Sequence, residues 1–411
     1  MHADPYHETI TWLFNQFPSY QLIGSKAYKP TIDNTKKILS LLGHPEKELK
    51  FLHIAGSNGK GSVSAMTASV LTEAGYKTGL FTSPHISDFR ERIRVNGQMI
   101  NKKDVIDFCL KVQSYDLDFS PSFFEVTFAM ALEHFKNEEC EYCVIETGLG
   151  GRLDATNVIK PEISVITTIS MEHTAILGDT IEKIATEKAG IIKSSTPVII
   201  GKRDPSTERV FRNVAEEIDA PLYFAKNLFN DQYTVPFLGE YQKENLNTAL
   251  NIFSILQHEK KIKPIDPMQI QKGLNSIKSN TGFYGRMEII SDSPLTIFDV
   301  SHNPEGITAT LSALKKINNG TLHILYGSSA DKDVKKIIEL FPKDSKLYLT
   351  TFRNERSLTK DQLEDINCKM DLNSPIFNNP KIALSEIQSS ANKEDTIIVF
   401  GSFFLISDFF T

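Results

Sequence analysis

Short apolar runs bounded by turn residues alternate with segments of helical periodicity along most of this 411-residue chain. Such runs are typical of buried strands, and the segments between them are long enough to form helices. Strands joined by helices form a parallel sheet, because the chain must cross the sheet before it can run in the same direction again. The pattern therefore predicts an α/β fold with mostly parallel sheets.

The alternation is interrupted near Ser279–Arg286, where Ser, Asn, Thr and two glycines break the pattern. Because the chain is long for one hydrophobic core, we expect two domains, residues 1–281 and residues 282–411. Helices are predicted at Ser62–Ala74 and Thr180–Ile192. Strands are predicted at Phe51–Ala55, Thr78–Thr82, Tyr142–Glu146, Ile163–Ile169, Pro197–Gly201, Leu295–Val300, Leu322–Tyr326, Lys346–Thr350 and Thr396–Gly401.

The composition is that of an ordinary globular protein, with 40% apolar and 23% charged residues. A formal net charge of −6 and the lack of a Lys/Arg block argue against nucleic-acid binding. The N-terminal segment has neither the basic start nor the apolar run of a secretory signal. The apolar stretch Thr396–Phe410 is too short and too interrupted to span a bilayer. We therefore expect a cytoplasmic protein with no membrane partner.

Two of the four cysteines, Cys140 and Cys143, form a C-x-x-C pattern. This spacing can serve redox chemistry or half of a zinc site, but no second Cys/His pair lies at metal-binding spacing. The favoured interpretation is a short turn that leads into the apolar strand at Val144-Ile145.

A glycine-rich segment, Gly56–Ser62, follows the predicted strand Phe51–Ala55 and leads into a predicted helix. Glycines let backbone N–H groups turn toward phosphate oxygens, the helix N-terminus adds partial positive charge, and Lys60 adds a full charge. The segment is shorter than the common G-x-x-x-x-G-K-S/T loop and has Gly61 after the lysine. The alternative is a plain strand-to-helix turn with a solvated lysine. The candidate phosphate ligands are Ser57, Asn58, Gly59, Lys60, Gly61 and Ser62.

This short loop resembles that of the Mur ligases and, among them, of the folylpolyglutamate and dihydrofolate synthases. Further motifs of that family follow in order over almost the whole chain. Three positions depart from the family pattern: Ser57 replaces Thr, Glu172 replaces Asp, and Val300-Ser301 replaces Gly-Ala. The further motifs are Thr82–His85, Phe89–Ile93, Asn96-Gly97, Ser122–Glu125, Glu146–Asn157, His173, Glu187–Gly190, Gly239–Gln242, Asn245, Asn247, Gly285–Glu288, Asp299–Pro304 and Asp331–Asp333.

The resemblance implies an ATP-dependent ligase that joins L-glutamate to dihydropteroate, giving dihydrofolate, and that adds γ-linked glutamates to folates. Amide formation in water requires an activated carboxylate, and ATP can activate it as an acyl phosphate. The expected architecture is a P-loop mononucleotide-binding domain with a mostly parallel sheet and a smaller, Rossmann-like α/β C-terminal domain.

Negative charge gathers on the phosphoryl group and the carboxylate, so cations are expected nearby. Mg²⁺ prefers a few oxygen ligands together with water and phosphate, which makes Ser83 and Glu146 suitable for one ion. The resemblance implies a second Mg²⁺ held by His173, and it implies that Lys188 is carbamylated by CO₂. Lys60, Glu146, His173 and Lys188 are therefore the candidate catalytic residues. Alternatively, Glu146 is a strand-end carboxylate without a task, His173 a capping residue and Lys188 an exposed helix residue.

The second domain is expected to complete the ATP site. Asp299 ends an apolar run and is placed to accept hydrogen bonds from the ribose hydroxyls, and His302 follows one short turn later. The resemblance implies that Arg286 contacts the phosphates and that Asn247 contacts adenine. The alternative is a surface arginine and a strand-end aspartate with no ligand.

The best candidate for binding the acid substrate is the segment Ser122–Glu125, because an aromatic face can stack on a pterin or aminobenzoyl ring. Phe123, Phe124 and Phe128 could equally be core residues at helical spacing. Ile23–Ser25 is a looser candidate for a lid over this pocket. The candidate substrate-binding residues are Ser122, Phe123, Phe124, Glu125, Leu153, Asp154 and Ala155.

Two other functions stay open. A peptidoglycan Mur ligase shares the ATP machinery, but such enzymes carry an extra N-terminal domain, for which Lys60 lies too near the start of the chain. A nucleotide-binding module without ligase chemistry would leave Glu146, His173 and Lys188 without a role. We expect small-molecule partners only, namely ATP, L-glutamate and dihydropteroate or folates, and a monomer.

Overall fold

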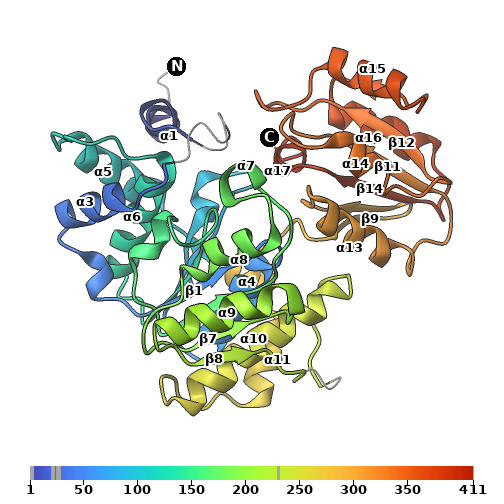
Figure 1. The fold of residues 1–411 in the computed structure, drawn as a ribbon. Coiled ribbons are helices and arrows are strands. Elements are labelled where there is room, and N and C mark those ends of the chain that lie inside the picture. The colour runs from blue at the N-terminus through green and yellow to red at the C-terminus, as the bar shows by residue number, and fades with distance from the viewer. Residues whose placement is uncertain (1–3, 20–23, 25–28, 229–231, 411) are drawn as a thin grey trace. The chain divides into compact units, whose positions relative to one another are not determined.

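The structure is a computed structural model that describes residues 4–19, 24, 29–228 and 232–410. The chain divides into two compact units, which Figure 1 shows in blue to yellow and in orange to red. The first unit comprises Met1–His85, Phe89–Pro236 and Gln242–Phe283, and the second comprises Ile86–Asp88, Phe237–Tyr241 and Tyr284–Thr411.

The first unit is built on an eight-stranded sheet with the order β4-β3-β2-β5-β1-β6-β7-β8. The pairs from β2 to β8 are parallel, and β3 and β4 extend the β2 edge as an antiparallel hairpin. The strands are β1 (Phe51–Ala55), β2 (Thr78–Phe81), β3 (Ile93–Val95), β4 (Gln98–Met99), β5 (Tyr142–Glu146), β6 (Ile163–Ile166), β7 (Val198–Ile200) and β8 (Leu222–Phe224).

Helices cover both faces of this sheet, as the apolar strands require. Helix α4 is buried along nearly its whole length, which suits its small and apolar residues. It packs against α11, where Ser69 Oγ donates a 2.6 Å hydrogen bond to the Gly273 carbonyl. The helices are α1 (Pro5–Gln16), α3 (Asp33–Leu41), α4 (Lys60–Glu73), α5 (Lys102–Gln113), α6 (Phe123–Asn137), α7 (Thr174–Leu177), α8 (Ile181–Ala189), α9 (Pro205–Glu217), α10 (Tyr241–His258), α11 (Pro267–Asn275) and α12 (Ile277–Thr281).

The second unit has a six-stranded sheet with the order β13-β12-β11-β14-β10-β9, in which only the edge strand β9 is antiparallel to its neighbour. Its strands are β9 (Glu288–Asp292), β10 (Leu295–Phe298), β11 (Leu322–Tyr326), β12 (Lys346–Thr350), β13 (Ile376–Phe377) and β14 (Thr396–Phe400). Its helices are α13 (Pro304–Leu314), α14 (Val334–Ile338), α15 (Lys360–Lys369), α16 (Pro380–Ser390) and α17 (Phe403–Ser407).

All nine predicted strands are present, and the fold class is confirmed. Four predicted boundaries are wrong by two or three residues, among them the end of β10, which lies at Phe298 instead of Val300. Helix α4 begins at Lys60, two residues before the predicted start, and α8 ends at Ala189, three residues before the predicted end. Strand β6 ends at Ile166 instead of Ile169, because the residues that follow bond to the glycine loop described below.

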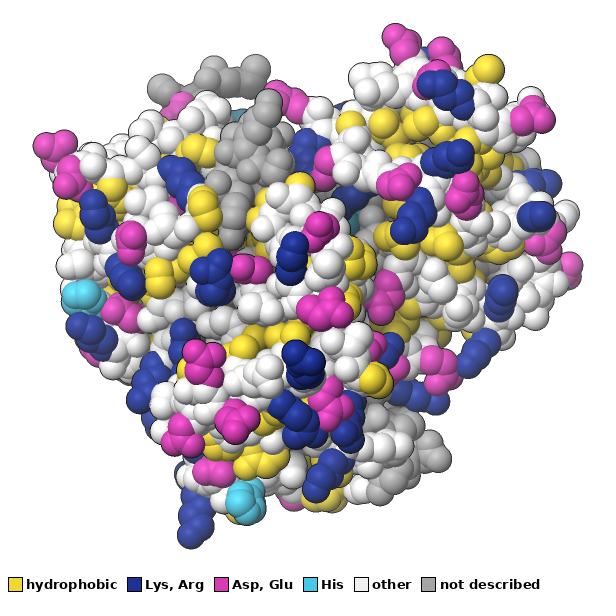
Figure 2. Space-filling view, in the orientation of Figure 1, with side chains coloured by type: hydrophobic (Ala, Val, Ile, Leu, Met, Phe, Trp, Pro, Cys, Tyr) yellow, Lys and Arg dark blue, Asp and Glu magenta, His cyan; other side chains and the backbone are white. Residues whose placement is uncertain are grey.

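The two cysteines of the C-x-x-C pattern are buried and carry free thiols, and Cys143 lies within β5. This arrangement agrees with a turn that enters a core strand. On the face shown in Figure 2, lysines and arginines are interspersed with aspartates and glutamates. Among the described residues, no helix combines the length and the apolar character needed to cross a bilayer.

One core residue of β1 is polar. His53 is fully buried, and its Nε2 lies 2.8 Å from Thr156 Oγ1. Burial, with a smaller contribution from the charge of Lys193, lowers the pKa of His53 to about 3 from 6.5. The folded state therefore holds this imidazole in its neutral form.

The low pKa of His53 predicts acid-sensitive stability. Between pH 6.5 and pH 3 the unfolded chain binds a proton at this position and the folded chain does not, so the free energy of unfolding falls as the pH falls. His53→Gln should flatten this dependence by up to about 1.4 kcal/mol per pH unit. Urea unfolding at a series of pH values measures it, with His258→Gln as control, because the His258 side chain is 82% exposed. Equal slopes in wild type and His53→Gln would contradict the prediction.

Candidate active site

The glycine-rich segment between β1 and α4 adopts a conformation that only glycine accommodates at two positions. Gly56 has φ +148°, and a Cβ there would lie 1.9 Å from Thr167 Oγ1. Gly59 has φ +85°, and a Cβ there would lie 2.3 Å from Asn245 Oδ1. Gly59 is the N-cap residue of α4 and provides no side-chain cap. The first N–H groups of α4 therefore remain suited to an anion.

The segment after β6 fastens this loop. The backbone N–H of Ser57 donates to the Thr168 carbonyl at 2.8 Å, and that of Asn58 donates to Thr168 Oγ1 at 3.1 Å. Thr167 Oγ1 donates to the Asn58 carbonyl at 2.6 Å, and Ser57 Oγ accepts from the Ser170 N–H at 3.0 Å. The predicted phosphate ligands Ser57 and Asn58 thus also shape the loop.

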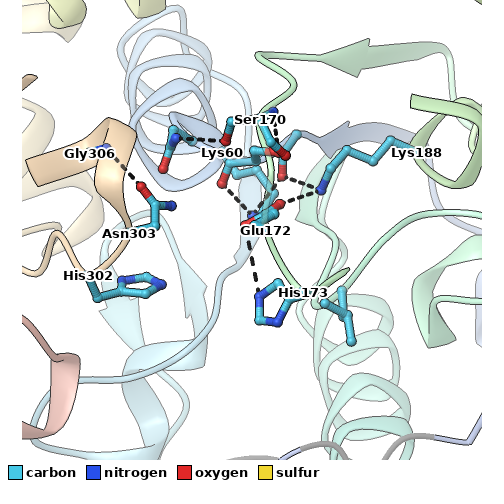
Figure 3. A network of polar contacts seen from close by, with 12 residues as sticks. Lys60, Ser170, Glu172, His173, Lys188, His302, Asn303 and Gly306 are labelled. Carbon is cyan, nitrogen blue, oxygen red and sulfur yellow. Dashed lines mark hydrogen bonds and ion pairs between the residues drawn. The ribbon is translucent and has the colours of Figure 1, made fainter. Parts of the chain in front are cut away.

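Two lysines bind the same carbonyl of the loop (Figure 3). Lys60 Nζ and Lys188 Nζ each donate to the Gly56 carbonyl at 2.9 Å. Lys188 Nζ also donates to Glu172 Oε1 at 2.8 Å, and Glu172 Oε2 lies 3.9 Å from His173 Nε2. The structure thus brings together three of the four predicted catalytic residues, and it adds Glu172.

Burial governs the charges of this cluster. The Lys188 side chain is only 2% exposed, and burial lowers its pKa, against the opposing effect of the Glu172 carboxylate. Burial alone would raise the pKa of Glu172, but the charges of Lys188, Lys60 and His173 lower it well below its usual value. Lys188 is therefore a buried, ion-paired residue and not an exposed one.

His173 occupies a strained backbone conformation, with φ +46° and ψ +38° at the N-cap of α7. A left-handed conformation is costly for a residue with a Cβ, and such strain is concentrated at functional sites. The His173 side chain makes no cap hydrogen bond, so a capping role does not account for this residue.

Glu146 and Ser83 lie together at the carboxyl end of the first sheet. Glu146 is the last residue of β5, is 4% exposed and pairs in register with Ile54 of β1. Its Oε2 accepts the Ser83 N–H at 3.1 Å. Among the described residues, no three His, Cys, Asp or Glu side chains gather as a self-sufficient metal site. One buried carboxylate beside a serine fits Mg²⁺, which completes its shell with water and phosphate.

Arg92 is a site residue that sequence reasoning missed, although it lies within the motif Phe89–Ile93. It is 2% exposed, and its Nε donates to His85 Nδ1 at 2.8 Å. Burial lowers the pKa of Arg92 to about 10, opposed by the charge of Glu146. The guanidinium thus fixes the segment that contains Ser83. The burial of Arg92 could not be predicted, because the neighbouring charged residues of its motif are typical of an exposed segment.

The predicted acid-binding segment has structural tasks of its own. Ser122 and Glu125 form a capping box at the N-terminus of α6. Phe123 is 2% exposed and lies between the stacked ring of Phe14, at 4.4 Å between centroids, and the Arg92 guanidinium. These contacts favour the core alternative for Phe123. Phe124 is half-buried, with its ring 5.6 Å from that of Phe81.

The second predicted acid-binding segment lies in the turn after the glycines. Asp154 is 4% exposed; its carboxylate accepts the Leu149 N–H at 2.7 Å and the Thr156 N–H at 3.0 Å. Burial raises the pKa of Asp154, and the hydrogen bonds that it accepts oppose this. Leu153 is half-buried and Ala155 is buried. Of the candidate lid, Ile23 and Ser25 lie outside the described residues.

The predicted nucleotide residues of the second unit lie around the end of β10. Asp299 is 1% exposed, and its carboxylate accepts the N–H groups of Met287 and Ser301, both at 2.8 Å. Asp299 thus holds its own loop together, and its role as an acceptor for the ribose hydroxyls stays a prediction. The Arg286 guanidinium lies 5.2 Å from the centre of the Phe403 ring. His302 Nδ1 lies 3.0 Å from the Val300 carbonyl oxygen.

Asn247 belongs to the first unit. It lies on α10, is half-buried, and its Oδ1 accepts the Leu228 N–H at 3.0 Å. Two residues earlier on the same helix, Asn245 lies against Gly59. Asn245 belongs to a motif recognised in the sequence, but only the structure shows that Asn245 lies close to the glycine loop.

An uncapped helix behind a glycine loop and a carboxylate at the end of a parallel strand are features of nucleotide-binding α/β proteins. The model of the Mur ligase middle domain matches residues 54–263, and that of the Mur ligase glutamate ligase domain matches residues 285–403. The chain belongs to the Mur ligase family.

Known relatives define the group within this family. A dihydrofolate synthase/folylpolyglutamate synthase of Bacillus subtilis is 32% identical over 92% of this chain and 94% of its own length. A probable bifunctional folylpolyglutamate synthase/dihydropteroate synthase of Haloferax volcanii is 29% identical over 98% of this chain, which spans 50% of that longer protein.

Solved structures agree with this placement. E. coli FolC in complex with DHPP and ADP has a TM-score of 0.85 and 27% identity, covering 99% of this chain and 97% of that one. The Yersinia pestis bifunctional folylpolyglutamate synthase/dihydrofolate synthase with AMPPNP and Mn has a TM-score of 0.84 and 26% identity, covering 98% and 97%. Within the Mur ligases, the chain is of the folylpolyglutamate synthase/dihydrofolate synthase type, a ligase that forms C–N bonds.

Proposed function

We propose that this ligase joins the amino group of L-glutamate to the carboxylate of dihydropteroate, giving dihydrofolate, and that it adds γ-linked glutamates to tetrahydrofolates. The observation that carries the proposal is the uncapped N-terminus of α4 with Lys60, in the same unit as the strand-end carboxylate Glu146. Relatives solved with DHPP, ADP and AMPPNP support the same substrates here.

The chemistry proceeds in two displacements. A substrate carboxylate oxygen attacks the γ-phosphorus of ATP, the bond to the β–γ bridging oxygen breaks, and ADP leaves. The glutamate amine then attacks the acyl carbon, phosphate leaves, and the amine loses a proton as the amide forms. Lys60 and the N–H groups of the glycine loop bind the phosphate oxygens where charge develops.

Ser83 and Glu146 would hold one Mg²⁺ ion, and His173 would hold a second. Bound divalent cations would neutralise the phosphate charge. The fit rests on the burial of Glu146, its contact with Ser83 and the strained backbone of His173. The Arg92–His85 hydrogen bond orients the segment of Ser83 for this task.

For nucleotide binding we propose Asn247 for adenine, Arg286 for the phosphates and His302 with the loop of Asp299 for the ribose side. We propose that residues 1–281 form the ATP-binding and catalytic domain and that residues 282–411 form the glutamate ligase domain. We further propose a cytoplasmic monomer.

The assay for this function is phosphate release by the purified enzyme with ATP, Mg²⁺ and L-glutamate. Dihydropteroate and tetrahydrofolate are supplied in separate reactions, and each should stimulate release only when glutamate is present. Mass spectrometry of the products counts the glutamates added. A Mur-type peptide ligase would respond instead to a UDP-sugar peptide, and a binding module would bind ATP without turnover. Either result would overturn the proposal.

The glycine loop provides a matched mutational test. Gly59→Ala introduces a Cβ with a φ of +85° and 2.3 Å from Asn245 Oδ1, whereas Gly75→Ala, after the same helix, has a φ of +90° and no atom within 4 Å. Both variants should lose about 1 kcal/mol of stability from backbone strain. Only Gly59→Ala should weaken ADP binding, by about 10-fold or more, since about 1.4 kcal/mol corresponds to a factor of ten. Calorimetric titration with ADP measures the difference, and equal affinities would refute the role of the loop.

We also propose that Lys188 is carbamylated in the active enzyme. Burial lowers its pKa, which favours the neutral amine that reacts with CO₂. Lys188→Ala should lower kcat by about 10- to 100-fold, the range for residues that support metal ligands, with ADP affinity retained. Lys183→Ala, an exposed lysine on the same helix, is the control. NMR of wild-type enzyme in ¹³C-bicarbonate should show a carbamate resonance. A fully active Lys188→Ala variant would contradict the proposed carbamate.

A further inference from the structure

We infer that His53 is a positioning residue for the acid-substrate side of the site and acts through Thr156 and Asp154 on the glycine turn after Glu146. This inference rests on the proposed function, because Leu153–Ala155 is the segment predicted from the sequence to bind the acid substrate of that reaction. His53 lies at the centre of the sheet in β1, between the ladders to β5 and β6. Its Nε2 contacts Thr156, which belongs neither to the phosphate loop nor to the lysine cluster described above.

The relay consists of three side chains and one backbone group. His53 Nε2 lies 2.8 Å from Thr156 Oγ1, and Thr156 Oγ1 donates a short hydrogen bond to Asp154 Oδ1. The other oxygen of Asp154 accepts the Leu149 N–H at 2.7 Å. A polar path therefore runs from the central strand to the turn that contains Gly148 and Gly150.

The directions of these bonds follow from the hydroxyl. Thr156 has a single hydroxyl proton, and it is directed to the Asp154 carboxylate, so the same oxygen accepts from His53. The proton of the imidazole therefore lies on Nε2. Nδ1 is then a buried acceptor, and it has no hydrogen-bond partner in the described part of the chain. His53 is thus held as one neutral tautomer.

A purely structural role does not account for this residue. The other four residues of β1 are apolar and fully buried, so an apolar side chain would satisfy the sheet at this position. A buried acceptor without a partner destabilises a fold. An apolar residue cannot donate the hydrogen bond that orients the Thr156 hydroxyl. His53 therefore orients this hydroxyl, and its unpaired Nδ1 lowers the stability of the fold.

The glycine turn depends on such an anchor. Gly148, Gly150 and Gly151 provide no side chains to fix it, and Gly150 has a φ of +72°. The Asp154 carboxylate spans this gap by holding the Leu149 N–H with one oxygen and Thr156 with the other. An apolar residue at position 53 would free the Thr156 hydroxyl to turn away from Asp154 Oδ1, and the carboxylate would be held only by the N–H groups of Leu149 and Thr156.

The kinetic test compares His53→Leu with His53→Gln. His53→Leu should raise KM for dihydropteroate about 10-fold, as for other residues that orient ligand-binding groups, with kcat and the KM for ATP within twofold. His53→Gln keeps an N–H donor at the end of its side chain and should restore the KM. Thr156→Val should raise the KM as His53→Leu does, and the double variant should show no further rise, because the residues act in series. Additive effects, or no rescue by glutamine, would overturn the inference.

A second measurement needs no substrate and separates this inference from the proposed function. Hydrogen-exchange mass spectrometry of the intact chain reports on the Leu149 N–H in a peptide that covers residues 147–157. Exchange should be faster in His53→Leu and Thr156→Val than in wild type, and unchanged in His53→Gln and in the exposed control His258→Gln. Wild-type exchange in His53→Leu would overturn the relay, whatever substrate the enzyme accepts. Faster exchange together with a failed dihydropteroate assay would retain the relay and reject the proposed substrate.

Discussion

Hydrogen bonds from outside the glycine loop between β1 and α4 hold most of its backbone, and the rest of the site depends on them. Thr167 and Thr168 bind its backbone, and Lys188 binds the Gly56 carbonyl. These contacts are possible because β1 and β6 are parallel neighbours that end at the same edge of the sheet. The chain after β6 therefore runs beside the loop before it reaches Glu172 and His173. The phosphate loop, Lys188 and Glu172 belong to one hydrogen-bonded assembly, and the candidate metal ligand His173 is the next residue of the chain.

Most of the fold follows from the sequence, because strands covered on both faces must be apolar throughout. The burial of all five residues of β1 and of β14 shows why these runs were recognisable. The glycine loop was predictable for a related reason, since a glycine run between a strand and a helix has few other uses. Glu146 and Ser83 were predictable as neighbours once β5 and β2 were expected to be parallel, because parallel strands bring their carboxyl ends to one edge.

The partners of individual polar side chains could not be predicted. The sequence shows Asp299 and Asp154 near the ends of elements, but the N–H donors that bind them come from irregular turns whose course depends on the whole fold. Each carboxylate is buried and shapes its own loop, a structural task that the sequence did not reveal. Phe123 illustrates the same limit, since its stacking partner Phe14 is more than a hundred residues away in the chain. The early end of β6 has this cause too, because Thr167 and Thr168 bond to the irregular glycine loop, whose course depends on the whole fold.

The two buried polar networks of the first unit have a common physical logic. A sheet fixes its residues through the ladder of backbone hydrogen bonds, and that control ends with the last paired residue. Beyond that point both candidate binding loops are rich in glycine, which permits close approach to a ligand but provides no side chain to hold a position. Lys188 holds one loop by the Gly56 carbonyl, and Asp154 holds the other by the Leu149 N–H. Burial of these groups destabilises the fold, because charged and polar atoms lose water. These buried groups hold two glycine-rich loops in place despite that cost in stability. A site that must bring a carboxylate to a phosphate requires its binding loops to be held in this way.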